Sequence, residues 1–165
     1  MCRVRSLLFL VLCTTTAAAE PLGEAEVRFG YGLSIAGRGE MTSRRASPLT
    51  ITATGSVRTS YEPPLAVYGG LVVETLDRTS AGGVAGIRLQ PQGAWWRLAA
   101  GGVAIVAPET LWGPSVSGGV CKRTSSSTRL CADAQLTAYF GGDDLAEGQV
   151  VTHVQLVGSV VVDAF

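Results

Sequence analysis

The stretch that decides the fold is residues 26–36, which read EVRFGYGLSIA. Apolar side chains occupy every second position from Val27 to Ile35, and arginine, glycine and serine stand between them. Successive side chains of a β-strand point to opposite faces, so this alternation predicts a strand with one apolar and one polar face. The same period of two recurs at residues 49–61, 65–76, 83–90, 94–106, 114–121, 130–140 and 149–163. Eight such segments, with no sustained 3.6-residue period after residue 20, predict an all-β protein.

The connections between these segments alternate in length. Tight proline-containing turns are predicted at residues 61–64 and 90–93, and mostly longer loops at 37–47, 77–82, 107–113 and 141–148. Short turns at one end and longer loops at the other are typical of an up-and-down meander. Closing eight strands into a barrel removes exposed strand edges, so we expect an antiparallel eight-stranded up-and-down β-barrel.

The first 19 residues have the pattern of a secretory signal peptide. Residues 1–5 carry two arginines, residues 6–13 (SLLFLVLC) are apolar, and residues 14–19 (TTTAAA) are small. Cleavage is expected before Glu20, which leaves residues 20–165 as one barrel domain. The apolar run is too short for a membrane-spanning helix. Leu12, in front of Cys13, disfavours lipid attachment at that cysteine.

The composition excludes several classes of protein. The chain has 165 residues, of which 47% are hydrophobic and 16% charged, with 13 basic and 13 acidic side chains. A disordered tail would be less hydrophobic, and a protein that binds nucleic acid through bulk charge would be more basic. We therefore expect one folded domain and no nucleic-acid partner.

Cys121 and Cys131 are the only cysteines after the predicted signal. Export takes them into an oxidising compartment, which favours a disulfide across the neck of a hairpin. Direct pairing of the two cysteines would set Gly119 opposite Asp133, and so polar residues opposite polar ones. Two cysteines and the single His153 are too few for a zinc site, and the acidic stretch at residues 143–147 lacks the spacing of a calcium loop, so no metal is expected.

Alternation does not decide whether the apolar face points into the barrel or out into lipid. Strand lengths near those that cross a bilayer, and polar faces with little lysine or glutamate, favour lipid. Aromatic residues that could form two membrane-interface girdles are Phe29, Tyr31, Tyr61, Trp96 and Phe165 toward the short-turn end, and Trp112 and Phe140 toward the other. The alternative is a soluble exported barrel, lipocalin-like or avidin-like, that binds a small apolar ligand among Val27, Phe29, Leu33, Ile51, Val57 and Trp96.

The whole chain after the predicted signal resembles the small eight-stranded outer-membrane β-barrels of Gram-negative bacteria, the OmpA-type and OmpX-type group. The resemblance rests on the signal, the eight alternating segments and a last segment, residues 154–165, that ends in Phe165. It implies location in the outer membrane and recognition of the terminal phenylalanine by the barrel-assembly machinery. Asp163 departs from the apolar or aromatic residue usual at that place.

A transmembrane barrel of this sequence would have a charged lumen. The polar faces would hold Arg28, Arg58, Glu74, Arg88, Arg97 and Asp133, together with Gln135, His153 and Gln155. An eight-stranded interior is only just filled by side chains, so a plug of paired charges is expected rather than a wide pore, with a narrow ion path as the alternative.

No catalytic site or cofactor is expected from the sequence. Six residues of strand separate His153 from Ser159, about 20 Å at 3.3 Å per residue. The His-x-Ser arrangement of the outer-membrane lipid A deacylases is missing, because His153 is followed by Val154 and Gln155. A basic group on the first loop is a candidate contact for lipopolysaccharide phosphates: Arg38, Arg44 and Arg45.

Overall fold

The computed structural model describes residues 23–60, 62–75, 79–91 and 93–164. The predicted signal at residues 1–19, Tyr61 and Phe165 lie outside these ranges. The described chain forms nine strands: β1 (Gly23–Arg38), β2 (Met41–Ala46), β3 (Leu49–Arg58), β4 (Leu65–Thr75), β5 (Thr79–Leu89), β6 (Trp96–Ala107), β7 (Leu111–Arg123), β8 (Thr128–Tyr139) and β9 (Gln149–Asp163). Within these ranges, no helix is long and apolar enough to cross a membrane.

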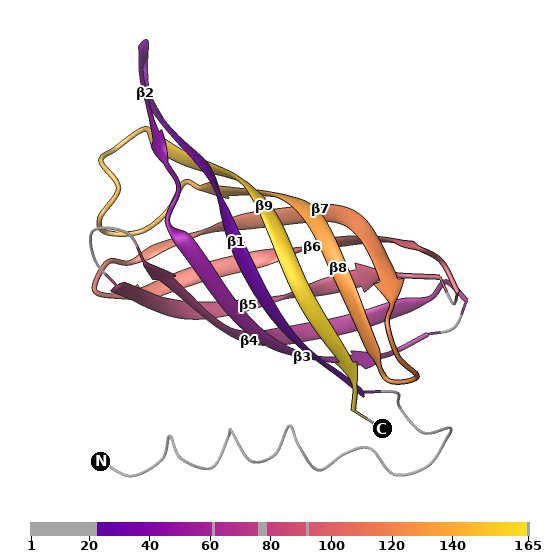
Figure 1. Ribbon diagram of the computed structural model, residues 1–165. Coiled ribbons are helices and arrows are strands. Elements are labelled where there is room, and N and C mark those ends of the chain that lie inside the picture. The colour runs from indigo at the N-terminus through magenta and orange to yellow at the C-terminus, as the bar shows by residue number, and fades with distance from the viewer. Residues whose placement is uncertain (1–22, 61, 76–78, 92, 165) are drawn as a thin grey trace, which may run out of the picture.

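Eight of the strands close into a barrel (Figure 1). Strands β1 and β3 to β9 each pair antiparallel with their neighbours, and β1 pairs with β9 from Glu24 opposite Asp163 to Arg38 opposite Gln149. The ring therefore has no free edge where the first and last strands meet. This confirms the predicted all-β, antiparallel, eight-stranded barrel.

The ninth strand corrects the prediction that residues 37–47 form a loop. β1 continues to Arg38, and β2 folds back on it, from Arg38 opposite Met41 to Leu33 opposite Ala46. Gly39, with φ +58°, adopts the left-handed conformation that a two-residue hairpin turn requires. The resulting β1–β2 hairpin projects beyond the rim of the barrel (Figure 1).

The short connections that follow β3, β5 and β7 lie at the end of the barrel where the described chain begins and ends. Ala164 N donates a hydrogen bond to Gly23 O at 2.7 Å, and the start of β1 and the end of β9 lie beside the turn between β7 and β8 (Figure 1). We call this the short-turn end. The opposite end carries the β1–β2 hairpin and the segment at residues 140–148, and we call it the loop end.

The hairpin of β7 and β8 has the predicted register. Cys121 lies directly opposite Cys131, and Gly119 lies opposite Asp133. The two sulfur atoms are bonded to each other. The side chains of both cysteines point into the barrel, because they share strand parity with Asp133, which is buried there.

The apolar faces of the strands point outward. Six residues spread over four strands are between 36% and 53% exposed, and we call them the apolar belt: Val27, Phe29, Ile51, Val57, Ile87 and Leu98. Buried charged and polar side chains occupy the alternate positions, inside the barrel. The alternative of a soluble barrel lined by Val27, Phe29, Leu33, Ile51, Val57 and Trp96 is therefore wrong, since these residues lie on the outer face. Pairing across the lumen stabilises the inward charges.

Candidate functional site

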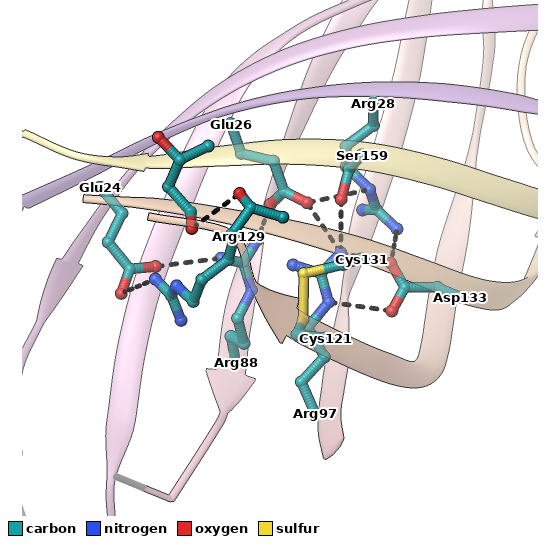
Figure 2. The surroundings of a disulfide bond; sticks show 12 residues. Glu24, Glu26, Arg28, Arg88, Arg97, Cys121, Arg129, Cys131, Asp133 and Ser159 are labelled. Atoms are coloured by element: carbon teal, nitrogen blue, oxygen red, sulfur yellow. Dashed lines mark hydrogen bonds and ion pairs between the residues drawn. A yellow bond between two sulfur atoms is a disulfide. The ribbon is translucent and has the colours of Figure 1, made fainter. Parts of the chain in front are cut away.

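Glu26 on β1 is the centre of a group of charges buried in the lumen. Its side chain is 3% exposed overall and accepts hydrogen bonds from Arg88 and Arg97, with Arg97 Nη2 2.8 Å from Glu26 Oε1. Arg28 Nε lies 3.8 Å from the same oxygen. The arginines come from β5, β6 and β1, so these contacts connect strands on opposite sides of the ring (Figure 2).

Asp133 on β8 is the second carboxylate of this group. Arg97 binds it through two nitrogens, with Nε 2.9 Å from Oδ1 and Nη2 bonded to Oδ2. Arg28 Nη2 lies 3.7 Å from Asp133, and Arg97 Nη2 donates to Ser159 Oγ at 2.9 Å. We call the whole set the lumen ion cluster: Glu26, Arg28, Arg88, Arg97, Asp133 and Ser159. Removing one member would leave a buried charge without its partner, which is costly in a low dielectric.

The sequence analysis placed Arg58 and Glu74 in the same charge network, and the structure places the two residues near opposite ends of the barrel. Arg58 is the last residue of β3 and lies at the short-turn end. Glu74 lies near the loop end, where its Oε1 accepts a hydrogen bond from the Tyr139 hydroxyl at 2.9 Å. Alternation shows which residues point inward, but their height along the barrel depends on strand register, which the sequence pattern does not contain.

Between the lumen ion cluster and the short-turn end, the lumen opens into a cavity of about 500 Å³. Arg129 bridges two acids there, with Nη2 2.7 Å from Glu24 Oε1 and 3.1 Å from Asp163 Oδ1. We call this space the short-turn cavity. Its charged lining residues are Glu24, Arg58, Lys122, Arg123, Arg129 and Asp163.

On the loop-end side of the lumen ion cluster, polar side chains fill the lumen. Gln155 Nε2 donates to Ser47 Oγ and Pro48 O, both at 3.0 Å, and Arg28 Nη2 donates to Gln135 Oε1 at 3.0 Å. The cavity at this level measures about 20 Å³, which is room for about one water molecule.

An apolar plug closes the loop end of the lumen. It consists of Val72, Val103, Ile105 and Tyr139, all buried, with Leu145 from the segment at residues 140–148 packed against them. Asp144 Oδ2 accepts a hydrogen bond from Thr110 N at 2.5 Å, which ties this segment to the connection between β6 and β7. Buried apolar side chains therefore occupy the loop end of the described lumen.

His153 lies beside the plug, with its Nδ1 4.0 Å from Glu74 Oε1 and its ring packed edge-on against Tyr139, 5.2 Å between centroids. The register sets Ser34 directly opposite His153, a pair that the sequence analysis missed because the two residues are far apart in the chain. Ser34 Oγ has no hydrogen-bond partner among the described residues, and the side chain is only 1% exposed. A nucleophile needs a base within hydrogen-bonding distance, so this pair lacks the geometry of an activated serine.

The aromatic residues assigned to interface girdles point outward where the structure describes them. Trp112 and Phe140 form an edge-to-face pair at the loop end, with centroids 5.0 Å apart, and Trp96 begins β6 at the short-turn end. Phe29 and Tyr31 are the seventh and ninth of the 16 residues of β1 and lie at mid-strand, away from the short-turn end. The strand extends further than predicted, because its last six residues pair with β2.

The basic residues of the first loop lie on the β1–β2 hairpin, whose second strand is exposed throughout. Arg45 lies opposite Ser34 and shares the lumen-side face with Arg38, whereas Arg44 lies opposite Ile35 and shares the outer face. The three arginines of the predicted basic group are therefore divided between the two faces of one hairpin.

Sequence reasoning missed four members of the charged interior. Glu24 and Glu26 have the strand parity of Arg28; Glu24 lies before the predicted strand, whereas Glu26 is its first residue and was not counted among its inward side chains. Arg129 was assigned to a loop and lies in β8, and Ser159 was considered only as a partner of His153. The alternation already assigned Glu26 to the inward face, and extending it two residues further back along β1 would have added Glu24. No group of three or more His, Cys, Asp or Glu side chains within the described ranges is placed to hold a metal ion.

A closed ring of eight antiparallel strands, apolar outside and charged inside, is the fold of the small eight-stranded outer-membrane β-barrels. The structure is similar to that of Neisserial surface protein A, with a TM-score of 0.59 and 9% identity over 86% of this chain and 96% of that one. It is also similar to that of Ail, the attachment invasion locus protein of Yersinia pestis, solved with the heparin analogue sucrose octasulfate. For Ail the TM-score is 0.47 and the identity 10%, over 85% of this chain and 98% of that one. No family model matches the chain, and no curated protein matches it in sequence.

Proposed function

We propose that this chain is a non-enzymatic protein of the Gram-negative outer membrane, exported by a signal peptide at residues 1–19, with a structural or surface-interaction role. The observation that carries the proposal is the apolar belt, which surrounds a lumen filled with paired charges. Exposed apolar side chains on several neighbouring strands, with their polar faces turned inward, fit a lipid environment and not water.

The same proposal sets the orientation in the membrane. Bacterial outer-membrane barrels have short periplasmic turns and longer extracellular loops, so the short-turn end would face the periplasm. Trp96 near that end and the Trp112–Phe140 pair near the other fit the two membrane interfaces. The barrel-assembly machinery is the proposed partner of the terminal Phe165.

A structural or surface role is favoured over conduction. The lumen ion cluster and the apolar plug fill successive levels of the barrel, and the space between them has room for about one water molecule. The β1–β2 hairpin, which projects beyond the rim, would be the part presented at the cell surface. Its Arg38, Arg44 and Arg45 are the proposed contacts for lipopolysaccharide phosphates.

Cell fractionation tests the location. We expect the protein in the outer-membrane fraction, with extraction only by detergent and faster gel migration before heating than after. Recovery from the periplasm or the medium without detergent would contradict the proposal.

Binding to immobilised lipopolysaccharide tests the surface contact. The variant Arg44→Gln/Arg45→Gln should bind more weakly than the wild type, whereas Glu40→Gln, on the same hairpin, should not. Equal binding by the wild type and the arginine variant would remove lipopolysaccharide as a partner of this hairpin.

A further inference from the structure

β2, the second strand of the projecting hairpin, is uncovered on both faces and along one edge. All six of its residues are exposed, and it pairs with β1 alone, so its other edge has no neighbouring strand. The β1–β2 hairpin carries three arginines, Arg38, Arg44 and Arg45, against the single acid Glu40. None of these arginines forms an ion pair with another described residue. The hairpin is therefore a positively charged piece of sheet without a partner among the described residues.

A second group of charges at the loop end has the opposite sign. Four acids stand in the two connections that join β6 to β7 and β8 to β9, and we call them the loop-end acids: Glu109, Asp143, Asp144 and Glu147. The hydrogen bond from Thr110 N to Asp144 holds the two connections together. Neither connection contains a lysine or an arginine, and no described cation pairs with these acids.

The two groups lie at the same end of the barrel but are not paired with each other within one chain. The hairpin projects beyond the rim of the barrel (Figure 1), and six residues of strand span about 20 Å. Arg38 lies opposite Met41, next to the turn at the tip of the hairpin. The positive charge therefore extends away from the connections that carry the negative charge. A surface with separate, unpaired groups of both signs is complementary to a second copy of itself.

We propose that the β1–β2 hairpin docks on the loop-end acids of a second copy of this chain, with the two barrels arranged loop end to loop end. In a two-fold symmetric contact each hairpin meets the acids of the other copy, so both charged groups are paired at once. Because each hairpin projects away from its own barrel, the contact joins barrels in two facing membranes. The inference rests on the proposed surface-interaction role and gives it a partner.

The strength of the contact would depend on salt and on the number of copies. A single exposed ion pair contributes little and is screened by dissolved ions. Two-fold symmetry repeats each pair, and a membrane presents many copies, so multivalency strengthens association without any new contact. We therefore expect association at low ionic strength and high protein density, and its loss in concentrated salt.

The test uses the full barrel in phosphatidylcholine vesicles that contain no lipopolysaccharide. Two vesicle populations carry different fluorescent lipids, and energy transfer between them measures vesicle association. Insertion in both orientations is sufficient, because the outward half presents the loop end. Wild-type vesicles should associate at about 10 mM salt, where the Debye length is about 30 Å, and separate at about 1 M, where it is about 3 Å.

Charge reversal on each side of the contact identifies the groups involved. Arg44→Glu/Arg45→Glu on the hairpin should raise the protein density needed for half-maximal association by about tenfold or more, because like charges then face each other. Asp143→Lys/Glu147→Lys, which leaves the hydrogen bond from Thr110 N in place, should have the same effect. All four changes together restore complementarity with the signs exchanged, so this variant should associate like the wild type. The control Glu62→Lys, exposed at the short-turn end, should change nothing.

Three results would overturn the proposal: no association of wild-type vesicles at low salt, failure of the folded fourfold variant to associate, or association only after lipopolysaccharide is added to the vesicles. Heat-modifiable migration checks that each variant is folded. The measurement does not depend on where the cell places the protein, so its failure would leave the proposed outer-membrane location untouched. Failure of the fractionation test would remove the proposed role but not the vesicle result.

Discussion

Replacement of Glu26 by glutamine tests whether the lumen ion cluster stabilises the barrel through charge pairing. Glu26→Gln keeps the size of the side chain and removes the negative charge that contacts Arg28, Arg88 and Arg97. Asp133 then remains as the one carboxylate within the cluster, against three arginines. All of these side chains are buried, so solvent would screen the excess positive charge poorly.

The expected loss follows from the burial of this cluster. Removing one partner of a buried pair costs about 3–5 kcal/mol, because the remaining charge stays desolvated without compensation. Glu40→Gln, at the exposed turn of the β1–β2 hairpin, removes the same charge and should change the free energy of unfolding by less than about 0.5 kcal/mol. Urea unfolding of the barrel in phosphatidylcholine vesicles, followed by tryptophan fluorescence, measures both variants.

A double-mutant cycle separates charge pairing from simple loss of packing. Arg88→Gln should be destabilising by itself, since it leaves Glu26 with one fewer partner. Together with Glu26→Gln it should cost about 1–3 kcal/mol less than the sum of the two single changes, because the variant contains less unpaired charge. Strict additivity, or equal stability of Glu26→Gln and Glu40→Gln, would refute the reasoning.

Three other predictions concern the disulfide, the outer face of the barrel and the packing of the strands. Cys121→Ser/Cys131→Ser should lower the free energy of unfolding by about 3 kcal/mol, measured by urea titration; in the wild type, neither thiol should react with maleimide before reduction. Phe29→Arg, in the apolar belt and at mid-strand, should cost about 2–4 kcal/mol in vesicles, and an unchanged urea midpoint would contradict a lipid-facing belt. Gly86→Ala would place a Cβ 2.4 Å from a carbonyl oxygen of β6 and should destabilise the barrel by about 1–3 kcal/mol. Gly55→Ala, where no atom lies within 4 Å, should fold and melt like the wild type in a heat-modifiability series.

The candidate site could be predicted in part. Arg28, Arg88, Arg97 and Asp133 were assigned to one face from strand parity, and the structure brings them into contact. Their shared acid Glu26, the first residue of the predicted strand, has the parity of Arg28 but was not counted with them. Parity is a local property of two or three neighbouring residues, whereas contact across the lumen joins positions as far apart as Glu26 and Arg97, 71 residues along the chain.

The sequence by itself determined the eight alternating segments, the antiparallel closure and the register of the β7–β8 hairpin. Each depends on local alternation or on the ten-residue separation of Cys121 and Cys131. The tertiary structure decided which face of each strand points outward and where each inward charge lies along the barrel axis. It also showed that Arg38, Arg44 and Arg45 belong to a projecting hairpin. These features depend on the closed ring, because its curvature and register bring side chains from distant strands together. The short-turn cavity exists only in that ring, since its cations come from β3, β7 and β8.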